Sequence, residues 1–155
     1  MRLHPEPFRI DVPEAVFDDL RARLRATRWP DRAPGPAWHQ GTDLDYLQAL
    51  VRCWLEEFDW RKQERRLNAY EHFTVELDGV RIHFVHRRSG KPAIVLMHGW
   101  PSTFAELLPV ADRIGEDFDL IIPSLPGYVF SSRPDGVGVN RKRVAQLMHR
   151  LMQGL

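Results

Sequence analysis

The sequence predicts an α/β fold, in which a helical N-terminal arm precedes an antiparallel hairpin and a parallel strand–helix–strand unit. Up to residue 72, apolar side chains recur every three or four positions, which is typical of amphipathic helices. From residue 73 they alternate with polar side chains, as in strands, and residues 93–97 are apolar at every position. We therefore expect a helical arm over residues 1–72 and an α/β core over residues 73–155.

The arm is expected to begin with a helix and a proline-rich loop. Pro13 suits the first turn of a helix, and the acidic and basic residues that follow match the polarity of the helix ends, which predicts a helix over residues 13–26. Trp29, which precedes a proline, ends it. Prolines and glycines exclude regular structure over residues 30–41. Trp29 and Trp38 flank this loop, and we expect both to be buried.

Two further helices are expected in the arm. Asp43 can cap the second, because its carboxylate can accept hydrogen bonds from the first backbone N–H groups. The apolar residues of this helix follow the spacing of a single face: Leu44, Leu47, Val51, Trp54 and Phe58. The third helix, over residues 61–70, is short and basic, and a solvated face explains its charges better than an anion site does.

The core is expected to contain an antiparallel hairpin, a parallel βαβ unit and a final helix. Asp78-Gly79 supplies the two-residue turn of the hairpin. A crossover helix joins the two parallel strands, which we expect to be covered on both faces. Asn140 caps the last helix, which stops near Gly154. The expected segments are residues 73–77 and 82–85 for the hairpin, 93–97 and 118–122 for the parallel strands, and 104–111 for the crossover helix.

Composition limits the partners that the chain attracts. Its 22 basic and 21 acidic residues leave a formal net charge of +1, so no global field favours nucleic acid or an anionic membrane surface. A single cysteine, Cys53, excludes an internal disulfide and fits a reducing compartment. No Cys or His cluster has the spacing of zinc ligands, and no apolar run is long enough to span a membrane. We expect a cytoplasmic chain without a metal or a cofactor.

A tetrapeptide follows the apolar strand at the edge where open α/β sheets place their ligands: His98, Gly99, Trp100 and Pro101. A glycine there allows a backbone N–H to approach a developing oxyanion, and the donor would be the N–H of Trp100. The alternative is a plain turn, in which His98 is a buried and hydrogen-bonded histidine. The tetrapeptide alone leaves both interpretations open.

A second loop follows the next strand at the same edge of the sheet, over residues 123–128. Two proline- and glycine-containing loops at one edge indicate the walls of a pocket better than two unrelated turns, so Pro126, Gly127 and Tyr128 are expected at a substrate-pocket edge. His83 and His86 are three residues apart on a strand and therefore point to opposite faces, which argues against joint metal binding.

The order and spacing of several motifs carry a resemblance to a known family. The arm contains Trp29-Pro30-Asp31 and Phe58-Asp59-Trp60-Arg61, and the core contains Ile82-His83-Phe84-Val85-His86, His98-Gly99-Trp100-Pro101 and Pro123-Ser124-Leu125-Pro126-Gly127-Tyr128. In these motifs the chain resembles the microsomal-type epoxide hydrolases of the α/β-hydrolase superfamily. It departs from the family pattern in two places: Ser102-Thr103 replaces a usual glycine-serine, and Val129 replaces a usual glycine.

The resemblance implies the first half of an α/β-hydrolase core that stops before the nucleophile strand. It also implies hydrolysis of a small-molecule epoxide to a vicinal diol, in which an aspartate attacks the epoxide and two lid tyrosines protonate its oxygen. A His–acid pair then activates water to hydrolyse the aspartyl ester, and an oxyanion donor such as the Trp100 N–H assists that step. We expect none of the nucleophile, the lid tyrosines and the catalytic histidine within this sequence, and hence no activity of the chain alone.

Two alternatives to an epoxide hydrolase fragment stay open. Related α/β-hydrolases share the His-Gly-x-Pro loop but use other nucleophiles, so the chain could belong to another hydrolase chemistry. It could also be a non-catalytic interaction module. The expected partners are an epoxide in the complete enzyme, and either a complementing C-terminal half or a second copy of the chain.

Overall fold

The computed structural model describes residues 2–155. These residues form two compact units, one over Asp11–Glu64 and the other from the residues up to Ile10 together with Arg65–Leu155. The expected domain boundary between residues 72 and 73 stays a prediction.

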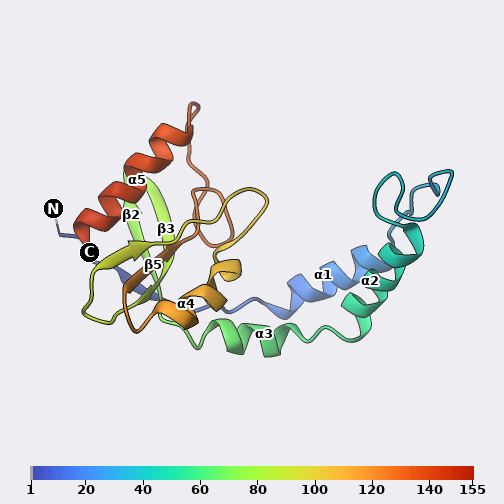
Figure 1. Ribbon diagram of the computed structural model, residues 1–155, viewed down its shortest axis with the longest axis horizontal. Helices are drawn as coiled ribbons and strands as arrows, with labels where there is room; N and C mark the ends of the chain where they lie inside the picture. Colours follow the sequence, from blue (N-terminus) through green and yellow to red (C-terminus); the bar gives the residue numbers. More distant parts are fainter. Residues whose placement is uncertain (1) are drawn as a thin grey trace. The chain divides into compact units, whose positions relative to one another are not determined.

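The unit over Asp11–Glu64 is helical. It contains α1 (Glu14–Arg25), α2 (Leu44–Glu56) and the start of α3 (Trp60–Leu67), which are labelled in Figure 1. Asp43 caps α2 as expected, because its carboxylate accepts hydrogen bonds from the backbone N–H groups of Asp45, at 3.0 Å, and of Tyr46, at 3.2 Å. The three helices expected in the arm are therefore present, with ends that differ by a few residues.

The apolar face of α2 has no buried residue, although the expected pattern along it is clear. Trp54 is 45% exposed, and in the preceding loop Trp38 is 57% exposed, so the expectation that Trp38 is buried is wrong. The Trp38 ring instead lies 5.0 Å from the ring of Tyr46 on α2. A 54-residue helical unit has too little apolar material to cover all of its own side chains, which leaves these aromatic rings exposed.

The second unit is built on a five-stranded mixed sheet with the order β1-β2-β3-β5-β4. All neighbours in it are antiparallel except β4 and β5, which are parallel. The expected turn is present between β2 and β3, where both Asp78 and Gly79 have positive φ, as a type I′ turn requires. The strands are β1 (Glu6–Phe8), β2 (His72–Leu77), β3 (Val80–Arg87), β4 (Ala93–Val95) and β5 (Asp119–Pro123).

Helices cover this sheet, and Figure 1 shows the sheet between α5 (Arg141–Gly154) and α4 (Leu108–Ile114). The main hydrophobic core forms where Leu147, Met148 and Leu151 of α5 pack on strand residues that include Ile82 and Phe84. The connection from β4 to β5 runs through a short 3₁₀ helix, η1 (Phe104–Leu107), and then α4. The expected α/β class, hairpin and parallel unit are thus confirmed.

Two strands differ from the expectation. β1 was not expected, because only three residues pair there with β2. β4 is shorter than residues 93–97 and is not covered on both faces, since Ala93 is exposed, Ile94 and Val95 are half-buried, and Met97 is 51% exposed. The reason is its position, because β4 is one of the two edge strands of the sheet formed by the described residues. No helix within residues 2–155 is both long and apolar enough to cross a membrane.

Candidate functional site at the ends of β4 and β5

The candidate site lies where the two expected loops leave the sheet. β4 and β5 are parallel and adjacent, so the loop after each of them starts at the same, carboxyl edge. The tetrapeptide that begins at His98 follows β4, and the segment that begins at Ser124 follows β5. The topology therefore brings together the two loops that sequence analysis singled out.

His98 joins the two loops by hydrogen bonds. Its side chain is buried, and its Nε2 atom accepts a hydrogen bond of 3.1 Å from the backbone N–H of Leu125 in the second loop. Because Nε2 accepts, a neutral His98 carries its proton on Nδ1, which lies 2.9 Å from the carbonyl oxygen of Gly99 and donates to it. The His98 ring also contacts the Tyr128 ring edge-on, with centroids 5.1 Å apart.

Trp100, the expected oxyanion donor, lies at the tip of the first loop. Trp100 is 82% exposed, and a cis peptide bond joins it to Pro101. The carbonyl oxygen of Gly99 accepts a second hydrogen bond, from the backbone N–H of Ser102 at 3.1 Å. Within residues 2–155, the Trp100 N–H forms no such bond with a backbone carbonyl, so the turn leaves this donor without a main-chain partner.

A chain of hydrogen bonds between buried polar groups connects the second loop to β2 and β3. His72 Nε2 lies 2.8 Å from the carbonyl oxygen of Leu67 and so donates to it, which leaves His72 Nδ1 to accept from His83 Nε2 at 2.9 Å. His83 Nδ1 then accepts from the hydroxyl of Ser124 at 2.9 Å. Burial lowers the pKa of His72, and burial and the neighbouring His72 lower the pKa of His83 to about 3. Both rings are therefore neutral near pH 7, as this chain of hydrogen bonds requires.

Ser131 completes the attachment of the second loop to β3. Its hydroxyl accepts from the backbone N–H of His83 at 2.9 Å and donates to the carbonyl oxygen of Ser124 at 2.7 Å. The expected pocket-edge residues lie in the loop so held, with Pro126 and Tyr128 half-buried and Gly127 exposed at a φ of 82°. Positive φ explains the glycine at position 127.

The two departures from the family pattern have different structural consequences. Thr103 caps η1, since its hydroxyl accepts from the backbone N–H of Ala105 at 3.3 Å, and the Ser102 hydroxyl bonds the Glu106 carboxylate. Ser102 and Thr103 thus fit the local structure. Val129, in contrast, has a φ of 47°, a region that glycine adopts easily and a β-branched residue adopts at a cost.

The polar chain through His72, His83 and Ser124 was not predicted from the sequence. The only prediction for His83 was that it cannot share a metal with His86. The signal was available, because the turn at residues 78–79 sets the register in which Thr74 pairs with His83. His72 lies two residues before Thr74 on β2. Its side chain is therefore on the same face of the sheet as that of His83 on β3, in the diagonal position.

The carboxylate of Asp119, near the sheet, has its partners away from the loop junction, where the loops after β4 and β5 meet at His98 and Leu125. Asp119 lies at the start of β5, where backbone N–H groups of Ser89 and Gly90 bind it and lower its pKa. His86 Nε2 lies 3.6 Å from Asp119, which is an ion-pair distance and too long for a hydrogen bond. Within residues 2–155 no group of three or more His, Cys, Asp or Glu side chains has the arrangement of a metal site.

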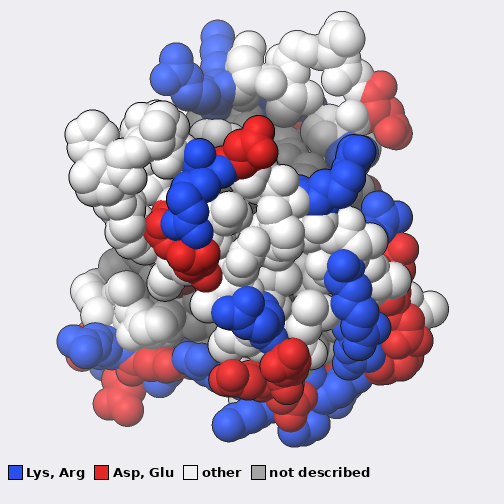
Figure 2. All heavy atoms as spheres, turned by 90° about the vertical axis from the view of Figure 1, so that its right-hand side faces the viewer, with Lys and Arg blue, Asp and Glu red and all other residues white. Residues whose placement is uncertain are grey.

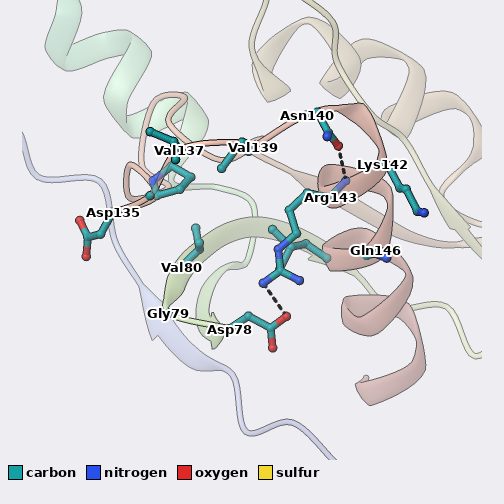
Figure 3. Close-up of a pocket in the computed structure, with 14 residues that line it drawn as sticks. Asp78, Gly79, Val80, Asp135, Val137, Val139, Asn140, Lys142, Arg143 and Gln146 are labelled. Atoms are coloured by element: carbon teal, nitrogen blue, oxygen red, sulfur yellow. Dashed lines mark hydrogen bonds and ion pairs between the residues drawn. The ribbon is translucent and has the colours of Figure 1, made fainter.

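Two cavities lie elsewhere and lack the chemistry of a site. One, of about 510 Å³, lies between the Asp78–Gly79 turn and the start of α5, and there Arg143 forms an ion pair of 2.9 Å with Asp78 (Figure 3). The other, of about 600 Å³, lies within the helical unit among apolar side chains such as Phe17, Trp54 and Phe58. In Figure 2 basic and acidic side chains alternate over the visible face, so this face has no single-sign patch for a polyanion.

Comparisons with known proteins agree in family and in fold. Residues 5–107 match the family described as "Epoxide hydrolase N terminus". The chain is 41% identical to a Stigmatella aurantiaca protein named "Putative epoxide hydrolase", in a match that covers 96% of this chain and 37% of that protein. It is 30% identical to "Epoxide hydrolase 1" of Oryctolagus cuniculus, over 94% of this chain and 36% of that protein.

Solved structures of epoxide hydrolases have the same fold over nearly the whole of this chain. The Aspergillus niger epoxide hydrolase superposes with a TM-score of 0.85 and 32% identity, over 97% of this chain and 43% of that one. The juvenile hormone epoxide hydrolase of Bombyx mori superposes with a TM-score of 0.82 and 28% identity, over 98% of this chain and 44% of that one. The chain thus spans less than half the length of each of these relatives.

Proposed function

Because the chain belongs to the family of epoxide hydrolase N termini, we propose that it forms the N-terminal part of an enzyme that hydrolyses epoxides to vicinal diols through an aspartyl ester. The observation that carries this proposal is the loop junction, where His98 ties the loop of the oxyanion donor to the loop of Tyr128. A plain turn after β4 does not require such a link to the neighbouring loop.

In this proposal the chain contributes to the second step of the reaction. Hydrolysis of an aspartyl ester passes through a tetrahedral oxyanion, and a preorganised backbone N–H stabilises such a charge. The N–H of Trp100 is free of backbone carbonyls within the described residues, and it lies at the edge of the sheet where α/β enzymes bind ligands. It is therefore suited to act as this donor.

The reacting groups of the first step are proposed to come from outside these 155 residues. The position of the carboxylates supports this, because Asp119 lies at the opposite end of β5 from Ser124, and Asp112 accepts a hydrogen bond of 2.8 Å from the Tyr70 hydroxyl. Neither follows β4 or β5 at the loop junction. We therefore expect the chain alone to leave epoxides unchanged.

The experiment compares the chain alone with a completed protein, in which the C-terminal portion of a related epoxide hydrolase is fused to it. Diol formation from styrene oxide is measured for both, and for a control fusion whose nucleophilic aspartate in the added portion is changed to asparagine. We expect diol from the completed protein only. Turnover by the chain alone that is abolished by changing one of its own aspartates would refute the proposal.

A further inference from the structure

One ring nitrogen of His98 donates a hydrogen bond and the other accepts one, and the two partners lie in different loops. Nδ1 donates to the carbonyl oxygen of Gly99 within the first loop, at 2.9 Å, and Nε2 accepts from the N–H of Leu125 in the second, at 3.1 Å. His98 is 6% exposed, so water competes little for either bond. The side chain is thus a fixed bridge with one defined tautomer.

The bond to Gly99 also fixes the direction of the Trp100 N–H. The carbonyl of Gly99 and the N–H of Trp100 belong to the same peptide group, which is planar and trans, so the two point in opposite directions. His98 and the N–H of Ser102 hold the carbonyl from one side. If this peptide group rotated by half a turn, the carbonyl would take the place of the N–H and the donor would be lost.

The bond to Leu125 fixes where this peptide group lies relative to the second loop. Leu125 directly follows Ser124, which His83 and Ser131 anchor to the sheet. The first loop has fewer anchors, because β4 is an edge strand and Trp100 is exposed. His98 therefore transmits the rigidity of the second loop to the first.

The geometry points to His98 as a positioning residue, which holds the Gly99–Trp100 peptide group in the orientation that presents the Trp100 N–H to the oxyanion. This inference rests on the proposed function in one respect, namely that the Trp100 N–H is the oxyanion donor. The bridge itself does not depend on that function and can be tested separately.

Two variants separate the two bonds of His98. In His98→Asn the side-chain amide occupies the position of Nδ1, so it can still donate to the Gly99 carbonyl but cannot reach Leu125. In His98→Gln the amide oxygen can reach the position of Nε2, so it can still accept from Leu125 but no longer holds Gly99. His98→Leu loses both bonds and keeps an apolar side chain of moderate size.

The first measurement is steady-state and single-turnover hydrolysis by the completed protein. We expect His98→Gln and His98→Leu to lower the rate of ester hydrolysis by at least about tenfold, and by no more than the roughly 10²–10³-fold loss that follows removal of one oxyanion donor. KM should change little, and His98→Asn should restore most of the rate. Equal rates for His98→Asn and His98→Gln at equal thermal stability would overturn the positioning role.

The second measurement is amide hydrogen exchange in the 155-residue chain, which needs no activity. We expect the N–H of Leu125 to lose protection in His98→Asn and His98→Leu but to keep it in His98→Gln. Unchanged protection in all three variants would overturn the bridge. A completed protein that is inactive with the native His98 would contradict the proposed function, and the exchange pattern alone would then decide whether the bridge exists.

Discussion

Val129 is a β-branched residue in a glycine-like conformation, with a φ of 47°. The left-handed region costs a non-glycine residue about 1–2 kcal/mol, and glycine loses about 0.5–1 kcal/mol more conformational entropy on folding. We therefore predict that Val129→Gly raises the free energy of unfolding by up to about 1.5 kcal/mol, as the difference between these two effects. Urea unfolding at low protein concentration measures the change.

The matched control is Val137→Gly. Val137 is fully exposed and is not among the residues with positive φ, so glycine there relieves no strain and should not stabilise the chain. A Val129→Gly variant that is less stable than the native chain would show that the valine side chain contributes packing that outweighs the backbone strain.

His83 makes the stability of the chain depend on pH. Burial and His72 lower its pKa from 6.5 to about 3 in the folded state. Between these values the unfolded chain binds a proton at this position and the folded chain does not, so stability falls as the pH is lowered from 6.5 toward 3. The lowered pKa of His72 acts in the same direction.

For His83 alone we predict a slope of about 1.4 kcal/mol per pH unit in the free energy of unfolding between about pH 6 and pH 4. Urea unfolding at several pH values measures it. His83→Gln removes this proton uptake and should therefore reduce the slope by about 1.4 kcal/mol per pH unit. An equal slope in the native chain and in His83→Gln would contradict the proposed neutral state of the buried ring.

At the scale of elements, the sequence predicted the segments whose signals are local. The turn at Asp78-Gly79, the cap at Asp43 and the alternation along β2 and β3 depend on neighbouring residues, and all three are present. β1 could not be predicted, because three residues carry too little pattern and their pairing with β2 links positions more than 60 residues apart. The exposure of β4 could not be predicted either, since it depends on what covers the strand.

The edge position of β4 leads to a prediction about association. β5 pairs with one side of β4, and no strand of the described residues pairs with the other side. Residues 93–97 carry no charge and no proline, and Met97 is 51% exposed. Such an edge recruits further strands, because its outward N–H and C=O groups are unpaired.

We therefore expect the chain to self-associate in a concentration-dependent way, measured by size-exclusion chromatography with light scattering. Ala93→Lys should reduce association without loss of packing, because Ala93 is exposed and a lysine is a common protection of sheet edges. Ala93→Ser is the uncharged control at the same position. A strictly monomeric native chain at all concentrations would contradict this account of β4.

At the scale of the whole molecule, the sequence predicted which loops meet but not how they are joined. The two loops lie close together because each follows one of two adjacent parallel strands at the same edge of the sheet. The apolar runs in the sequence already indicated these two strands. The bridge through His98 and the support through His72, His83 and Ser131 depend on side-chain orientations that follow from register and packing. The family match then relates these loops to epoxide hydrolases, of which the chain spans the N-terminal part.

The most direct test of the central claim, that this chain supplies the oxyanion donor, is the single-turnover rate of ester hydrolysis in the completed protein with two changes at Trp100. Trp100→Pro removes the backbone N–H, and Trp100→Ala keeps the N–H while removing the same exposed ring. We predict that Trp100→Pro lowers the rate by about 10²–10³-fold and that Trp100→Ala stays within a fewfold of the native rate. A near-native rate with Trp100→Pro would mean that the loop after β4 is only a turn.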